Sequence, residues 1–128
     1  MRIERLAARA LMAAGLALAA GAAAACGHCV EDRIASVYDH AVIESAKATH
    51  LEIAFLAVEG PQPHGDTTRR AVLAALEKGG GVKRTARISL ETSACSIAYD
   101  PAKVSLRQLV EGSNRALAAR GIRLVELR

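Results

Sequence analysis

The sequence predicts an α+β fold built on a four-stranded antiparallel sheet with two helices on one face. From residue 48 on, apolar segments with strand or helix periodicity follow one another in the order β-α-β-β-α-β. Glycine, proline or capping residues stand at the junctions between these segments. The length of 128 residues allows a single domain, so the segments must share one core. One extra helix is expected before the first strand.

The first half of this pattern consists of apolar runs separated by glycine-rich loops. Residues 50–59 are mostly apolar, which is typical of a buried strand, and the loop Gly60-Pro61-Gln62-Pro63-His64-Gly65 ends it. A helix is expected over 68–78, where apolar residues recur at helical spacing, and the glycines of 79–81 stop it. The same periodicity predicts the extra N-terminal helix over 30–47.

The second half begins with a hairpin and ends with a capped helix and a short strand. Apolar and polar residues alternate over both hairpin strands, as they do when one face of a strand is buried. Ser105 and Gln108 form a capping box, which predicts the start of the last helix. The expected bounds are 82–90 and 94–99 for the hairpin, 106–120 for the helix and 122–127 for the last strand. Two interleaved right-handed β-α-β crossovers in this order produce the ferredoxin-like arrangement.

Residues 1–25 have the pattern of a secretory signal peptide, so we expect the protein to be exported to the periplasm. Three arginines precede an apolar stretch that is too short to cross a bilayer, and small residues follow it. The alternative is a lipoprotein with an acylated Cys26, and only then would the protein be bound to a membrane. Against this alternative, Ala23 stands where such signals usually carry leucine.

The composition excludes several classes of function. The formal net charge is +4, and half of this excess belongs to the first 25 residues, so it does not indicate a nucleic-acid partner. Aromatic residues make up 2% of the chain, too few for a stacking platform or an aromatic cage. No Ser/His/Asp set, carboxylate pair or phosphate-binding glycine loop stands out, and we therefore expect no enzymatic activity.

The residues with the most distinctive chemistry are Cys26-Gly27-His28-Cys29, directly after the expected signal peptide. Two thiols separated by two residues can face one soft metal ion, and His28 adds an imidazole. Thiolates favour Cu(I) here, because a structural zinc would need two more ligands and the chain has no second pair. Cys26, His28 and Cys29 are therefore predicted metal ligands, with copper first and other thiophilic ions as alternatives. Cys95 lies within an expected strand and is predicted to be a core residue.

Three other interpretations of the same segment stay open. Cys26 and Cys29 can form a disulfide that has no further role. Cleavage before Cys26 would leave a free amine with His28 at position three, which is a square-planar site for Cu(II) or Ni(II). The segment also looks like the active-site tetrapeptide of disulfide isomerases, although no strand precedes it as that fold requires. Haem attachment is excluded, since Val30 rather than histidine follows Cys29.

Three stretches of the second half share a pattern with a known family. They are Gly81-Val82-Lys83-Arg84-Thr85-Ala86-Arg87-Ile88-Ser89-Leu90-Glu91, Ser96-Ile97-Ala98-Tyr99-Asp100-Pro101 and Val104-Ser105-Leu106-Arg107-Gln108-Leu109-Val110-Glu111. With them, residues 50–128 resemble the heavy-metal-associated domain family of copper and mercury carriers. The resemblance implies soft-metal binding and transfer of the metal to a metal-accepting or metal-transport protein. The chain then divides into a signal peptide (1–25), a segment with the cysteine pair and extra helix (26–47) and the carrier-like domain (48–128).

The family's own metal loop is missing from this chain. Family members carry Met-x-Cys-x-x-Cys between the first strand and the first helix, where residues 60–66 contain neither thiol nor methionine. Only His64 is a candidate ligand there. Either the cysteine pair has moved to the N-terminal segment, or that segment folds back so that His64 completes the site, or the domain has lost metal binding. An adaptor with a Cys26–Cys29 disulfide is thus the main alternative to a metal carrier, and a thiol-disulfide oxidoreductase is the third.

Overall fold

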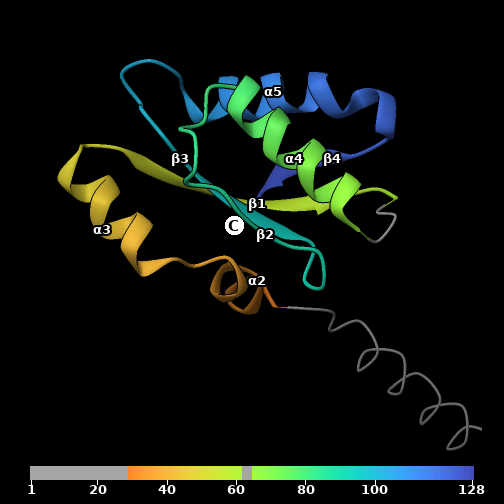
Figure 1. The fold of residues 1–128 in the computed structure, drawn as a ribbon, viewed down its shortest axis with the longest axis horizontal. Helices are drawn as coiled ribbons and strands as arrows, with labels where there is room; N and C mark the ends of the chain where they lie inside the picture. The colour runs from red at the N-terminus through yellow and green to blue at the C-terminus, as the bar shows by residue number, and fades with distance from the viewer. Residues whose placement is uncertain (1–28, 62–64) are drawn as a thin grey trace, which may run out of the picture.

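The computed structural model describes residues 29–61 and 65–128 and confirms the predicted α+β fold (Figure 1). Its elements are α2 (Val30–Ser36), α3 (His40–Ala48), β1 (Glu52–Glu59), α4 (Asp66–Lys78), β2 (Arg87–Ser89), β3 (Ala94–Tyr99), α5 (Leu106–Leu117), a 3₁₀ turn (Ala118–Arg120) and β4 (Arg123–Glu126). The sheet has the order β2-β3-β1-β4, and all neighbouring strands are antiparallel. This is the ferredoxin-like arrangement that the order of segments predicts.

Several predictions fall outside the described residues. The signal peptide, Cys26 and His28 lie within residues 1–28, and His64 lies within 62–64. Over the ranges that the structure describes, no helix has the length and apolar character needed to span a bilayer.

The main core lies between the sheet and the helices α4 and α5, which cover the same face (Figure 1). Its largest side chains are fully buried: Leu56, Leu76, Ile97, Leu109, Leu117 and Leu124. The two helices approach closely at Gly79, where a Cβ would lie 2.6 Å from the carbonyl oxygen of Leu109. The predicted capping box begins α5, because Ser105 Oγ accepts a hydrogen bond from the Gln108 amide at 3.1 Å and Gln108 Oε1 accepts one from the Ser105 amide at 3.0 Å.

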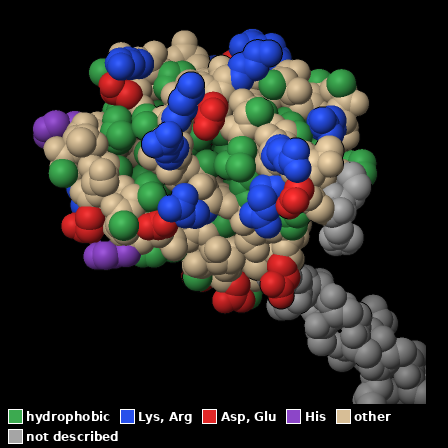
Figure 2. Space-filling model, in the orientation of Figure 1, with side chains coloured by type: hydrophobic (Ala, Val, Ile, Leu, Met, Phe, Trp, Pro, Cys, Tyr) green, Lys and Arg blue, Asp and Glu red, His purple; other side chains and the backbone are tan. Residues whose placement is uncertain are grey.

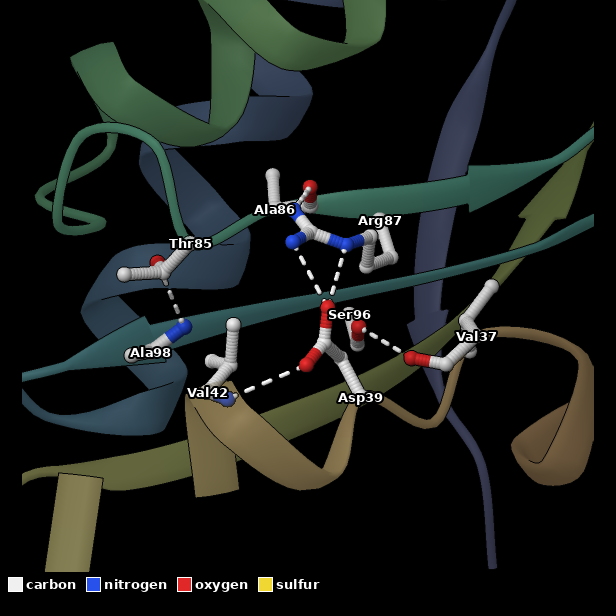
Figure 3. A network of polar contacts seen from close by, with 8 residues as sticks. All are labelled: Val37, Asp39, Val42, Thr85, Ala86, Arg87, Ser96 and Ala98. Carbon is white, nitrogen blue, oxygen red and sulfur yellow. Dashed lines mark hydrogen bonds and ion pairs between the residues drawn. The ribbon is translucent and has the colours of Figure 1, made fainter. Parts of the chain in front are cut away.

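The extra helix predicted over 30–47 is instead two helices, α2 and α3, separated by residues 37–39. Val37 leaves the helical conformation, and its carbonyl accepts a hydrogen bond from the buried Ser96 hydroxyl of β3 at 2.8 Å (Figure 3). Asp39 then caps α3, since its carboxylate accepts a hydrogen bond from the Val42 amide at 3.1 Å. This hydrogen bond is the main cause of the lowered pKa of Asp39. Helical periodicity continues across the break, so the apolar pattern does not reveal it.

The helices α2 and α3 cover the face of the sheet opposite α4 and α5, so the domain has three layers (Figure 1). The sheet residues under them are mostly small and buried: Ala57, Ala94, Ser96 and Ala98. The sequence predicts a helix before the sheet but contains no signal for the face on which it packs.

The second difference concerns the strand predicted over 82–90, of which only β2 forms. The Val82 amide still donates to the Ala98 carbonyl at 2.8 Å, but Arg84 has a φ of 67° and turns the chain out of the sheet. Thr85 Oγ1 then accepts a hydrogen bond from the Ala98 amide at 3.0 Å and donates to the Val82 carbonyl at 2.7 Å. A side-chain hydroxyl thus supplies a bond that the strand backbone would otherwise make, and the alternating pattern of the sequence cannot reveal this.

Candidate functional site

Cys29 is the one predicted ligand within the described residues, and it directly precedes α2. Its backbone is extended, with φ −62° and ψ 155°, and its carbonyl accepts the first helical hydrogen bond from the Arg33 amide at 3.0 Å. The side chain is exposed and makes no capping hydrogen bond to the helix. A thiol in this position is accessible to a metal ion or to another thiol in solution.

The helix that follows Cys29 is held against the β2–β3 turn by the side chain of Arg33. Arg33 Nε donates to the Thr92 carbonyl at 3.0 Å and Nη2 donates to the Ser93 carbonyl at 2.7 Å. The Ser93 carbonyl also accepts a hydrogen bond from the Val58 amide, near the end of β1, at 2.8 Å. These bonds place α2, and Cys29 with it, at the end of the sheet where β1 runs into its loop.

The loop between β1 and α4 starts in a restricted conformation. Gly60 has a φ of 104°, and a Cβ at this position would collide with the carbonyl oxygen of Gly121. The backbone therefore leaves β1 in a direction that only glycine permits without strain. His64 belongs to this loop but lies outside the described residues. The start of its loop and the cysteine-bearing helix share one end of the sheet.

The described residues do not form a metal site by themselves. Within 29–61 and 65–128, no three His, Cys, Asp or Glu side chains gather closely enough to hold an ion. Cys95 is fully buried, and this burial raises the pKa of its thiol to about 12, so it is a core residue as predicted. His40 and His50 are exposed residues of the N-terminal layer. The other predicted ligands, Cys26, His28 and His64, lie outside these ranges.

The surface beside Cys29 is acidic. Glu31 and Asp32 lie in the first turn of α2 and are exposed, and Figure 2 shows Asp and Glu side chains at the lower edge of the molecule, where α2 lies in Figure 1. Carboxylates in this position attract cations.

The hydrogen bonds of Arg33 were not among the predicted features. They join residues that are separated by 59 and by 60 positions in the chain, and no local pattern contains such pairs.

Among solved structures, this chain is similar to the crystal structure of oxidized MerP from Ralstonia metallidurans CH34. The two share 23% sequence identity with a TM-score of 0.47, over 61% of this chain and 99% of that chain. No protein-family model matches the chain, and no curated protein does. The assignment of the fold therefore rests on the strand order and the helix placement described above.

Proposed function

We propose that this protein is an exported carrier or buffer for a soft metal ion, with Cu(I) as the first candidate, bound by Cys26 and Cys29 with His28 assisting. The observation that carries the proposal is the exposed Cys29, placed at the start of a helix that Arg33 ties to the domain. Cys26 lies three residues earlier in the chain, and its thiol can face the same ion. The resemblance of residues 50–128 to metal carriers points in the same direction.

The mechanism would be ligand exchange between thiolates. Two thiolates leave Cu(I) open to attack by a third thiolate from a metal-accepting protein, so the ion passes across without being released into water. The acidic residues Glu31 and Asp32 favour the approach of the cation. His64 is a further candidate ligand, because its loop starts at the end of the sheet to which α2 is tied.

The test is the native mass of the protein under anaerobic conditions, before and after addition of Cu(I). We expect one copper per reduced chain, which is lost when Cys26 and Cys29 are both changed to serine. Cys95→Ala is the matched control, because this thiol is buried in the core, and it should bind copper as the unmodified chain does. His28→Ala and His64→Ala should weaken binding less than the double serine variant.

The same spectra give the result that would overturn the proposal. If Cys26 and Cys29 form a disulfide, and the chain takes up no metal even after this disulfide is reduced, the carrier is eliminated and the adaptor is favoured. The masses would also report the cleavage site and any acylation of Cys26.

A further inference from the structure

A hollow of about 290 Å³ lies between α3 and the sheet, on the face opposite α4 and α5. Much of its wall is apolar and comes from α3, the residue before β1 and the centre of the sheet: Val42, Ala46, Leu51 and Ala98. This volume is near the lower end of the range in which proteins bind small molecules. The hollow lies where α3 stands over the turn at 82–85, and Cys29 does not line it.

Three cationic side chains line the hollow: Lys83, Arg84 and Arg87. Arg87 is bound to Asp39, whose Oδ2 lies 2.8 Å from Nε and 2.6 Å from Nη2 (Figure 3). Within the described ranges, Lys83 and Arg84 form no ion pair with a carboxylate. The hollow therefore carries an excess of two positive charges beside its apolar wall.

The backbone that bears these two cations is fixed. The Thr85 hydroxyl donates a hydrogen bond to the Val82 carbonyl and accepts one from the Ala98 amide, and these two bonds close the turn against the sheet. Figure 3 shows the bond to Ala98. Arg84, at a φ of 67°, is held in the conformation that directs the turn outward. Because the backbone of the turn is already ordered, only the exposed side chains of Lys83 and Arg84 must be ordered on binding.

We propose that this hollow binds a short-chain monocarboxylate, with the carboxylate at Lys83 and Arg84 and the alkyl chain against the apolar wall. The charge-assisted contacts with Lys83 and Arg84 favour an anion over a neutral amide. The apolar wall favours an acid with an alkyl chain over a compact anion such as acetate or inorganic phosphate. Such a ligand touches α3 and the sheet together, so its binding stabilises the attachment of the N-terminal layer.

The test is a titration of the ¹⁵N-labelled protein with hexanoate, hexanamide, acetate and inorganic phosphate, followed by NMR. We expect hexanoate to shift the amide signals of α3, residues 82–87 and Ala98 in a saturable manner. Hexanamide, acetate and phosphate should each bind at least about tenfold more weakly, since each lacks one of the two contacts. Hexanoate should also raise the melting temperature, by an amount that grows with the logarithm of its concentration once this exceeds the Kd.

The variant for this test is Lys83→Gln with Arg84→Asn, where asparagine is chosen because it tolerates a positive φ. It should weaken hexanoate binding at least about tenfold. Lys103→Gln with Arg120→Gln removes the same charge from exposed positions elsewhere and should bind hexanoate as before. If the first variant fails to fold, the single Lys83→Gln variant at an exposed position carries the test.

Three results would overturn the proposal. The first is the absence of saturable shifts with hexanoate. The second is equal binding of hexanoate, acetate and phosphate, which would indicate an adventitious ion only. The third is an equal loss of binding in the two double variants, which would indicate a general effect of net charge rather than a site.

Discussion

The two faces of the sheet are covered by different kinds of contact. Towards α4 and α5 the strands present large apolar side chains, of which Leu56, Ile97 and Leu124 are at most 1% exposed. Towards α2 and α3 most of the buried side chains are alanine or serine, and the larger Phe55 and Val125 stay partly exposed. Because buried apolar area is the main stabilising contribution, the first face must hold the domain together.

The N-terminal layer is attached more by hydrogen bonds than by apolar area. Its buried apolar residues are Val37 and Ala46, whereas Arg33, Asp39 and Ser96 each bond across the interface between this layer and the sheet. The net contribution of such a hydrogen bond is small, about 1 kcal/mol. The layer that carries Cys29 should therefore detach more easily than α4 or α5, and the variants below test this difference.

The largest effect is expected from a cavity on the α4–α5 side. Leu76→Ala should lower the free energy of unfolding of the whole domain by about 2–5 kcal/mol, because this side chain is fully buried. Val37→Ala in the N-terminal layer should cost about 1–2 kcal/mol and increase amide exchange mainly in α2 and α3. Its matched change on the other face is Val72→Ala, which removes the same two carbons from a fully buried site in α4. Denaturant unfolding together with hydrogen exchange measures both. Equal losses in global stability would contradict the comparison.

A pH dependence is expected from the same side of the sheet. The pKa of Cys95 rises from 9.0 to about 12 on folding because the thiol is buried, so the unfolded chain releases this proton first. The contribution is complete below pH 9 and is lost as the pH rises towards 12, with about 3 kcal/mol gone near pH 11. Thermal unfolding between pH 8 and 11 measures it. Cys95→Ala should reduce this dependence to the part that comes from Tyr99, whose pKa burial also raises to about 12. Cys29→Ala, at an exposed thiol, should leave the dependence unchanged.

The smallest of these effects is expected from a single buried hydroxyl. Ser96→Ala leaves the Val37 carbonyl without its partner and should cost about 1 kcal/mol, seen as faster amide exchange in α2 and α3. Ser113→Ala is the matched control, because Ser113 also donates to a carbonyl at 2.8 Å, that of Leu109. That carbonyl lies within α5 and keeps a helical hydrogen bond, so the cost there should be smaller. A larger loss in Ser113→Ala would contradict this account.

The candidate site could be predicted less completely than the fold. The spacing of Cys26 and Cys29 indicates soft-metal chemistry without any structure, and the burial of Cys95 follows from its place in a strand. The attachment of Cys29 to one end of the sheet depends on Arg33, which the sequence presents as an ordinary helical arginine. The hollow beneath α3 depends on the turn at 82–85, which lies within a segment whose sequence predicts a continuous strand.

The order of strands and helices, the fold class and the N-terminal cap of α5 could all be predicted from local patterns, because periodicity and capping act over a few neighbouring residues. Long-range contacts instead set the break of the N-terminal helix after Ser36, the face of the sheet that this helix covers and the position of Cys29. The bonds responsible join Ser96 to Val37, Arg87 to Asp39 and Arg33 to Ser93, at separations of 59, 48 and 60 residues. No local pattern contains partners so far apart, and only packing against the finished sheet selects them.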